Sequence, residues 1–283
     1  MFSILLASIL SFASEDADRA YSLADKFVNT CTPRDAGTVR GRNASFWILD
    51  NASAVGANVK RDQFTVNTPN GRKALANLYA EFRAPDSDEW IVLVSHYDTK
   101  WGVDCPGAND GASTTALLIA LANRLFDCRD LKKNVMLVWT DGEECMKDYS
   151  DGDGLFGSRR AVEIIRQRGL DVRAVVCLDM LGDKDLHIAI PSNTTEALSK
   201  IAWHAARRIG EKDLVTFSSD VVTDDHVPFV DAGISAVNLI DFSYGPNNSW
   251  WHTPEDSMDK ISRDSLLKSG RLVCELLNLL LKM

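Results

Sequence analysis

Two adjacent glutamates, Glu143 and Glu144, follow a run of apolar residues in the segment VWTDGEECMKDY, which spans residues 138–149. Neighbouring carboxylates repel each other, and a nearby cation relieves that repulsion. Of two glutamates directly after a strand, one can bind a metal ion while the other stays free. A free carboxylate beside a cation is suited to move protons, first as general base and then as general acid. We therefore predict that Glu144 is a metal ligand and that Glu143 is the base.

Other acidic and imidazole side chains follow apolar, strand-like segments in the same way. They are His96, Asp98, Asp141 and Asp179, with Asp224, Asp225, His226 and His252 around the last such segment. Asp110 lies in PGANDGAS, a glycine-rich turn before an expected helix. Ligands of an open α/β sheet bind at the carboxyl ends of its strands, so this fold would bring these residues to one edge.

A single acid at a strand end is usually solvated or caps a helix, and Asp110 taken alone fits a helix cap. Several buried polar side chains at one rim are costly unless a cation neutralises them, which favours a metal site for the whole set. That set is His96, Asp110, Glu144, Asp179 and His252. Imidazole and carboxylate ligands without a thiolate favour zinc over manganese or cobalt. His187 and His204, in an alternating strand and on a helix, are not expected to be ligands.

The elements that must position these residues alternate between strands and helices. Near-continuous apolar strands are expected at 90–99, 134–144, 174–180 and 234–241, with helices at 16–29, 37–50, 111–126, 157–168, 194–208 and 263–282. Continuous apolar runs are typical of strands buried on both faces of a mostly parallel sheet. Segments 59–66 and 73–82 alternate around TPNG and predict a hairpin. The expected fold is a three-layer α/β sandwich with a central, mostly parallel mixed sheet and an antiparallel edge hairpin.

The composition is that of a soluble globular protein, and the N-terminus indicates export. With a formal charge of −9 over 283 residues, non-specific nucleic-acid binding is disfavoured. Residues 2–13 are apolar, too short to span a bilayer, and end in small residues before an acidic stretch. We expect a signal peptide over residues 1–13, a single catalytic domain over 14–283, no transmembrane segment, and a secreted or periplasmic protein. A buried first helix is the alternative, and the missing basic start counts against export.

Six cysteines fit an exported protein with roughly one to three disulfide bonds. Those in or near expected loops are the better candidates, namely Cys31, Cys105, Cys128 and Cys145. Cys177 in a strand and Cys274 in a helix are expected to be buried free thiols. No C-x-x-C pair occurs, which excludes a cysteine zinc ribbon.

Taken together, the segments HYDT, GANDGAS, DGEE, LDM, DDHVPF and WHTPEDSMDKIS resemble the zinc aminopeptidase family built on the co-catalytic exopeptidase α/β fold. The resemblance covers roughly residue 59 to the C-terminus. It implies one of two chemistries on the N-termini of peptides or proteins. Aminopeptidases of this family hold two zinc ions and hydrolyse the first peptide bond. Glutaminyl cyclases of animal type and their bacterial relatives hold one zinc ion and convert N-terminal glutamine to pyroglutamate.

Four features resemble the cyclase branch. They are HYDTK at 96–100, the insertion CMKDYSDGDG between DGEE and LFGSRR, the DDH triplet at 224–226, and Trp251 directly before His252. GANDGAS, in contrast, is closer to the peptidases and bacterial cyclases. Where the animal cyclases carry a tryptophan five residues after the ligand glutamate, this chain has Tyr149, which retains an aromatic pocket wall.

The cyclase resemblance implies a role for each matching residue. Its zinc ligands would be Asp110, Glu144 and His252, and Glu143 would be the proton shuttle, with Asp179 and Asp224 in a hydrogen-bond network beside it. Trp251 would wall the pocket for the glutamine side chain. We expect a monomeric, zinc-dependent glutaminyl-peptide cyclotransferase that releases ammonia. In the alternative, a di-zinc aminopeptidase, His96 and Asp179 complete a second zinc site and Asp110 bridges the two ions. A binding protein without activity is disfavoured because the ligands and the base are all intact.

Overall fold

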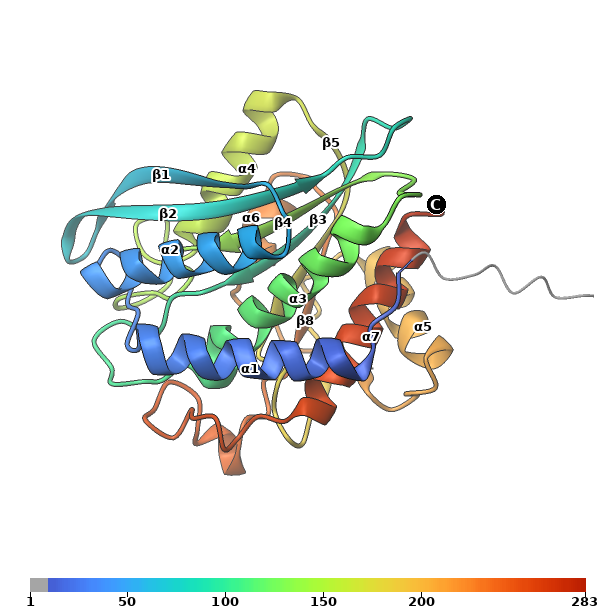
Figure 1. The fold of residues 1–283 in the computed structure, drawn as a ribbon. Coiled ribbons are helices and arrows are strands. Elements are labelled where there is room, and N and C mark those ends of the chain that lie inside the picture. Colours follow the sequence, from blue (N-terminus) through green and yellow to red (C-terminus); the bar gives the residue numbers. More distant parts are fainter. Residues whose placement is uncertain (1–9) are drawn as a thin grey trace, which may run out of the picture.

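A six-stranded mixed sheet runs through the computed structural model, which describes residues 10–283 (Figure 1). In spatial order the strands are β1 (Val59–Thr68), β2 (Gly71–Phe82), β4 (Asn134–Thr140), β3 (Glu89–His96), β5 (Asp171–Asp179) and β8 (Ala236–Ile240). The last four in this order are mutually parallel, whereas β1 pairs antiparallel with β2 and β2 antiparallel with β4. This confirms the predicted mixed sheet with an antiparallel edge hairpin.

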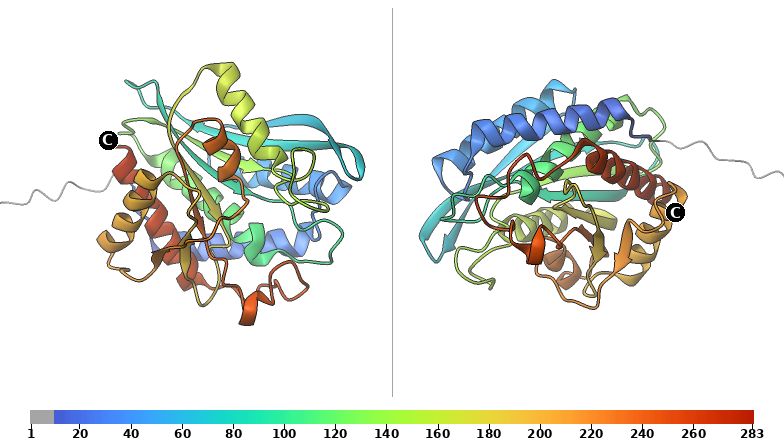
Figure 2. Two further views of the ribbon diagram at one scale, coloured as in Figure 1. Left: turned by 180° about the vertical axis from the view of Figure 1, so that it is seen from behind. Right: turned by 90° about the horizontal axis from the view of Figure 1, so that it is seen from below.

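Helices cover both faces of the sheet, as the two views in Figure 2 show. One face carries α1 (Ser14–Cys31), α2 (Val39–Ala54), α3 (Thr114–Asp127), α5 (Glu196–Arg208) and α7 (Arg263–Leu280), and the other carries α4 (Phe156–Arg168) and α6 (His226–Asp231). Within β3, Ile91 and Leu93 point into the first core, and Val92 and Val94 into the second. The period of two along a strand therefore divides one apolar run between two cores.

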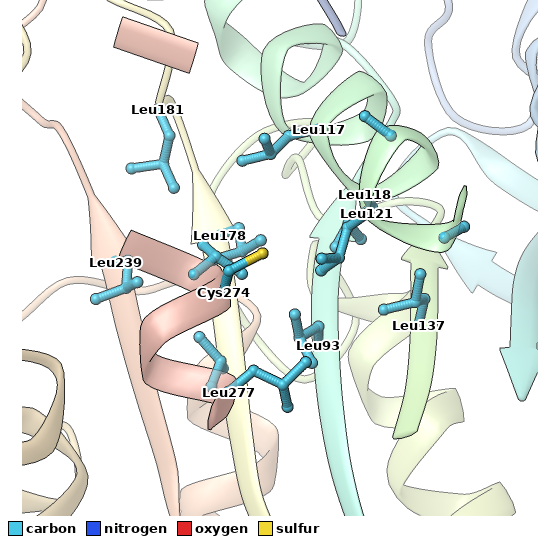
Figure 3. Packing of buried hydrophobic residues seen from close by; sticks show 14 of the residues in the cluster. Leu93, Leu117, Leu118, Leu121, Leu137, Leu178, Leu181, Leu239, Cys274 and Leu277 are labelled. Atoms are coloured by element: carbon cyan, nitrogen blue, oxygen red, sulfur yellow. The ribbon is translucent and has the colours of Figure 1, made fainter. Parts of the chain in front are cut away.

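The larger core lies where α3 and α7 meet the parallel strands (Figure 3). Leu117 and Leu121 from α3 and Leu277 from α7 pack over Leu93 and Leu137 of the sheet, each with at most 1% of its surface exposed. Burying a leucine side chain contributes about 1.5–3 kcal/mol, so this layer holds the strand ends in a fixed relation to one another.

The segment before α1 lies against α7. The main chain of Leu10 donates to Asn278 Oδ1 and accepts from Asn278 Nδ2, both at 2.8 Å. The ring of Phe12 fills the space above Gly270, where an added Cβ would come within 2.2 Å of the ring. Most of the predicted signal peptide, residues 1–9, lies outside the described residues. No helix between residues 10 and 283 is long and apolar enough to cross a membrane.

The sequence did not indicate a second, small sheet, in which β6 (Ile188–Ile190) pairs parallel with β7 (Val215–Phe217). His187, expected in an alternating strand, directly precedes β6, and with only three residues in each strand the pattern did not indicate their pairing. The helix expected from Gly111 begins at Thr114 instead, because residues 108–113 form a wide turn around non-helical Asp110 and Gly111.

The expected disulfide bonds are absent, since all six cysteines are free thiols in the structure. Two of the four cysteines expected to form bridges contact other groups. The thiol of Cys145 lies 3.1 Å from the ammonium of Lys100, and that of Cys105 lies 4.0 Å from a carboxylate oxygen of Asp256. Cys177 and Cys274 are buried free thiols, as predicted.

Candidate active site

The polar residues singled out in the sequence meet at one edge of the sheet. His96 and Asp179 are the last residues of the parallel strands β3 and β5. Glu143 and Glu144 lie in the turn after β4, residues 141–144, which we call the glutamate turn. Asp110 lies in residues 107–110 before α3, the Asp110 turn. His252 is on the loop after β8. Because β3, β4, β5 and β8 are parallel, their carboxyl ends bring all of these side chains together.

Asp110 occupies the centre of this group. Its Oδ1 atom lies 3.1 Å from His96 Nε2, and its Oδ2 atom lies 3.3 Å from His252 Nε2. His96 Nε2 is also 3.1 Å from Asp179 Oδ1, and His252 Nε2 is 2.7 Å from Glu144 Oε1. Two potential metal-binding triplets result, His96–Asp110–Asp179 and Asp110–Glu144–His252, with the ligand atoms of each within 4.8 Å of one another. Asp110 belongs to both.

Burial and mutual contact shift the pKa values of this cluster strongly. Burial alone would lower the pKa of His96, but hydrogen bonds to Asp110 and Asp179 override it and raise that pKa well above its ordinary value. For His252, bonds to Asp110 and Glu144 override the same effect of burial and raise the pKa to about 9. Burial raises the pKa of Asp179 to about 8. These shifts favour the protonated forms of the three groups, and a bound cation would supply the positive charge that the buried carboxylates need.

An unsatisfied oxygen indicates where such a cation fits. Glu144 Oε2 is buried and has no hydrogen-bond partner among the described residues, although Lys100 Nζ lies 3.5 Å away. A buried carboxylate oxygen without a partner is costly. The three residues of the Asp110–Glu144–His252 triplet supply two carboxylates and one imidazole, a ligand set that catalytic zinc uses with one open position.

Each of the two turns is held from behind by a buried carboxylate. Asp98 accepts the main-chain N–H groups of Glu143 and Glu144 at 3.1 and 3.2 Å. Asp256 accepts those of Asn109 and Asp110 at 2.8 and 3.2 Å. Both acids have no exposed surface. The sequence placed Asp98 near the site but gave it no role. Asp256 was missed, although it lies only four residues beyond His252.

Arg34 is a further residue that the sequence did not reveal. Its guanidinium is completely buried and donates to the carbonyl oxygens of Tyr97, Pro106, Gly107 and Asp110, at 2.5, 2.7, 2.6 and 3.2 Å. Burial lowers the pKa of Arg34, and the neighbouring Cys105 and Asp256 act in the opposite direction. Arg34 thus fixes the path of the Asp110 turn from the side opposite the ligands. One arginine in a loop carries no periodic signal from which this could have been predicted.

Glu143 lies apart from both triplets and faces a cavity of about 190 Å³. Tyr149 and Trp251, the predicted wall residues, line this cavity, together with Asp179 and Asp224. Trp251 stacks on the ring of His252, with centroids 3.8 Å apart. Burial and the neighbouring Glu144 raise the pKa of Glu143 well above its ordinary value. The structure therefore places a free carboxylate beside the potential ligands, inside a pocket with aromatic walls.

The remaining polar residues near the strand ends have structural contacts. Asp224 accepts a hydrogen bond from Asn238 Nδ2 at 2.6 Å, and Asp225 accepts one from Thr140 Oγ1 at 2.5 Å. Asp141 accepts the N–H of Ala76 at 2.9 Å. His187 and His204 belong to neither potential metal triplet.

Backbone strain concentrates at this edge. His252 has φ 55°, and Met180, directly after Asp179, has φ 53°. Left-handed conformations of non-glycine residues are unfavourable and cluster at functional sites. Gly111 has φ 120°, and a Cβ there would lie 2.7 Å from the carbonyl oxygen of His96. The glycine after Asp110 is therefore required for the turn to approach β3.

Fold and site together define an exopeptidase-like α/β protein with potential metal-binding residues at the carboxyl edge of the sheet. Residues 77–277 match the sequence profile of peptidase family M28. The chain belongs to this family. Its relatives include glutaminyl cyclases and an aminopeptidase.

Three relatives illustrate the similarity. A glutaminyl-peptide cyclotransferase of Drosophila melanogaster is 27% identical over 272 residues, which cover 85% of this chain and 76% of that protein. Aminopeptidase YwaD of Bacillus subtilis is 32% identical over 193 residues, covering 65% of this chain and 39% of that protein. The crystal structure of a glutaminyl cyclase from an Acidobacteriales bacterium superposes with a TM-score of 0.90 at 32% identity, covering 100% of this chain and 99% of the other.

Proposed function

We propose that this protein is a zinc-dependent glutaminyl-peptide cyclotransferase, which converts the N-terminal glutamine of peptides to pyroglutamate and releases ammonia. The observation that carries the proposal is the end-to-end similarity to a bacterial glutaminyl cyclase, which covers 100% of this chain. The small cavity beside Glu143 supports it, because a reaction within one residue needs room for that residue alone.

Asp110, Glu144 and His252 would hold the zinc ion. The orphaned Glu144 Oε2 atom and the two carboxylates and one imidazole of this triplet fit that metal. When bound, zinc supplies Lewis acidity at the carbonyl oxygen of the substrate's γ-carboxamide.

The residues of the chain then handle protons and orientation. The substrate's own α-amine attacks its γ-carboxamide carbon, so that one C–N bond forms and the bond to the departing nitrogen breaks. Glu143 takes a proton from the amine and gives it to the leaving ammonia. Asp179 and Asp224 line the cavity beside Glu143 and complete its acidic surroundings. Trp251 holds the side chain so that amine and carboxamide meet, which is the main contribution when both groups belong to one residue.

An aminopeptidase reaction is the second candidate, and a specific observation favours it. The triplet His96–Asp110–Asp179 is as compact as the first triplet and shares Asp110 with it. Two ions held in this way would suit hydrolysis of the N-terminal peptide bond, with Glu143 deprotonating the attacking water.

Incubation of the zinc-loaded protein with a glutaminyl peptide and, separately, with leucine p-nitroanilide distinguishes the two reactions. We expect pyroglutamate and ammonia without release of nitroaniline, and one zinc ion per chain. Nitroaniline release with two ions per chain and no pyroglutamate would replace the cyclase by the peptidase.

We also propose that the protein is a monomer with one catalytic domain. The apolar run at residues 2–13 supports the further proposal that it is exported, either secreted or periplasmic. Sequencing the N-terminus of the protein recovered from outside the cytoplasm tests export. It also locates the cleavage site relative to Leu10, whose main chain is bound by Asn278.

A further inference from the structure

We infer that Tyr149 is a positioning residue whose hydroxyl holds the carboxylate of Glu143 in its working orientation. This inference deepens the proposed function and rests on Glu143 acting as the base, a role common to both candidate reactions. The Tyr149 hydroxyl lies 3.1 Å from Oε1 and 3.3 Å from Oε2 of Glu143. Among residues 10–283, no other group forms a hydrogen bond with the Glu143 side chain.

A single partner matters because Glu143 is otherwise free to turn. Its main-chain N–H is fixed by Asp98, but its side chain can still rotate about three torsions. Because only 5% of the residue is exposed, solvent does little to orient the carboxylate. A carboxylate offers about four acceptor positions, so the hydroxyl between both oxygens leaves others open toward the cavity. The Tyr149 hydroxyl thereby orients the carboxylate of Glu143 without occupying all of its acceptor positions, so the carboxylate can still accept a proton from a substrate amine.

The segment that carries Tyr149 is built as a closed loop. Asp153 accepts the main-chain N–H groups of Met146, Lys147 and Asp148 at 2.6, 2.7 and 3.2 Å. Ser150 and Asp153 also exchange main-chain hydrogen bonds of 3.0 and 3.2 Å. A charged acceptor shared by three consecutive amides is a strong local anchor, and it fixes the chain on both sides of Tyr149.

Contacts from outside the loop hold it in place. Arg159 of α4 donates to the carbonyl oxygens of Ser150, Asp151 and Gly154 at 2.9, 3.0 and 3.1 Å. At the start of the loop, Lys100 donates to the carbonyl oxygen of Cys145 at 2.9 Å. The insertion therefore has little freedom as a body, although much of it lies at the surface.

The end of the loop packs directly on the tyrosine. Gly154 has φ 77°, and an added Cβ would lie 2.6 Å from Cδ1 of Tyr149 and 2.9 Å from the carbonyl oxygen of Glu143. Leu155 N donates to that same oxygen at 2.9 Å. The end of the loop is thus bound to Glu143, which lies in the turn after which the loop begins. The phenol ring of Tyr149 packs against Gly154 on one side, and its hydroxyl contacts the carboxylate of Glu143.

The test is Tyr149→Phe, which keeps the aromatic wall and removes only the hydroxyl. We expect kcat on the substrate that wild type turns over to fall roughly 10- to 100-fold, the range for loss of a hydrogen bond to a charged group. KM should stay within about threefold and zinc content should be unchanged, because neither the wall nor a ligand is altered. The matched control is Tyr79→Phe, in which a buried phenol away from the pocket loses its bond to Asn77. Its kcat should equal that of wild type.

Asp153→Ala provides a second route to the same contact, because it releases the loop without touching the pocket. We expect a loss of kcat similar to that of Tyr149→Phe, and a double variant no more than about twofold slower than Tyr149→Phe, since both changes act through one hydroxyl. A Tyr149→Phe enzyme with wild-type kcat, additive losses in the double variant, or loss of zinc in Tyr149→Phe would each overturn the inference. A wild-type protein without activity on either substrate would instead refute the proposed function.

Discussion

The Asp110 turn and the glutamate turn are built on the same device but serve different ends. In each, two consecutive main-chain N–H groups donate to a fully buried carboxylate, which belongs to Asp256 in the Asp110 turn and to Asp98 in the glutamate turn. Asp256 belongs to the segment that also carries His252, so that one element fixes two of the proposed ligands. Asp98 lies two residues after His96, and the turn that it holds carries one proposed ligand, Glu144, and one free acid, Glu143.

The surroundings differ as well. Behind the Asp110 turn lies Arg34, with donors on four carbonyl oxygens, whereas the side chain of Glu143 is held by one phenol. A residue that binds a metal ion must be rigid in position. A residue that moves protons needs a fixed direction and free acceptor positions. The Asp110 turn supplies only a proposed ligand, whereas the glutamate turn combines a proposed ligand, Glu144, with the free acid Glu143.

The largest effect is expected from Glu143→Gln. Removing the base should lower kcat by roughly 10²- to 10⁴-fold, while zinc remains bound because Glu143 is in neither ligand triplet. Turnover assays and metal analysis of the purified variant check both parts. Glu144→Gln is the matched variant, and it should lose zinc. If the two variants had the same effects on kcat and on zinc content, the assignment of Glu143 as the base and Glu144 as a metal ligand would be wrong.

Arg34→Lys tests the rigid turn. Lysine keeps the charge but cannot present the planar fork of donors that four carbonyl oxygens require. We expect a loss of about 3 kcal/mol in the free energy of unfolding, by denaturant titration of the metal-free protein. The control is Arg166→Lys on α4, whose guanidinium donates at 3.4 Å near the surface. That exposed change should stay within about 0.5 kcal/mol.

Asp256→Asn and Asp98→Asn compare the two anchors directly. An amide has one acceptor oxygen where a carboxylate has two, so each variant can accept fewer of the hydrogen bonds from its two N–H groups. Asp256→Asn should weaken zinc binding roughly 10- to 100-fold, as measured by competition with a chelator, because two proposed ligands move. Asp98→Asn should weaken it less and lower kcat more, since its turn also carries Glu143. The reverse order would contradict the comparison.

The smallest effect concerns Asp225, which supports the start of the glutamate turn through Thr140, the last residue of β4. Burial, reinforced by Asp224, raises the pKa of Asp225 from 3.8 to about 7. Between these values the folded protein binds a proton that the unfolded chain has lost, so stability falls as pH rises. Asp225→Asn has no proton to lose. Its stability relative to wild type should therefore increase from about pH 4 to about pH 7, by on the order of 1–3 kcal/mol. Denaturation curves at both pH values measure this difference, and a constant difference would exclude the titration of Asp225 as its cause.

Much of the fold could be predicted because its signals are local. The continuous apolar runs of β3, β4 and β5 and the alternation around TPNG depend on adjacent residues. The topology of parallel strands then predicted that the site lies at the carboxyl edge of the sheet. It also predicted that one group of side chains meets there, namely His96, Asp110, Glu144, Asp179 and His252.

The supporting residues could not be predicted in this way. Asp256, Arg34 and the hydroxyl of Tyr149 act through contacts with chain segments 6 to 147 residues away. No period or motif in the sequence encodes which amide or carboxylate a buried polar side chain will meet. The cysteines show the same limit, since their loop positions indicated bridges that the packing does not form.

The two hydrogen bonds between the main chain of Leu10 and the side chain of Asn278 join positions that are 268 residues apart. As a chain emerges from the ribosome in order, its first helix is made long before the partner against which the preceding residues close. In a chain that retains them, Leu10 and Phe12 therefore stay uncovered until α7 has been synthesised. Completion of the native core is thus a late event in the biogenesis of this protein, and a chain truncated before α7 would leave that early apolar segment open to other contacts.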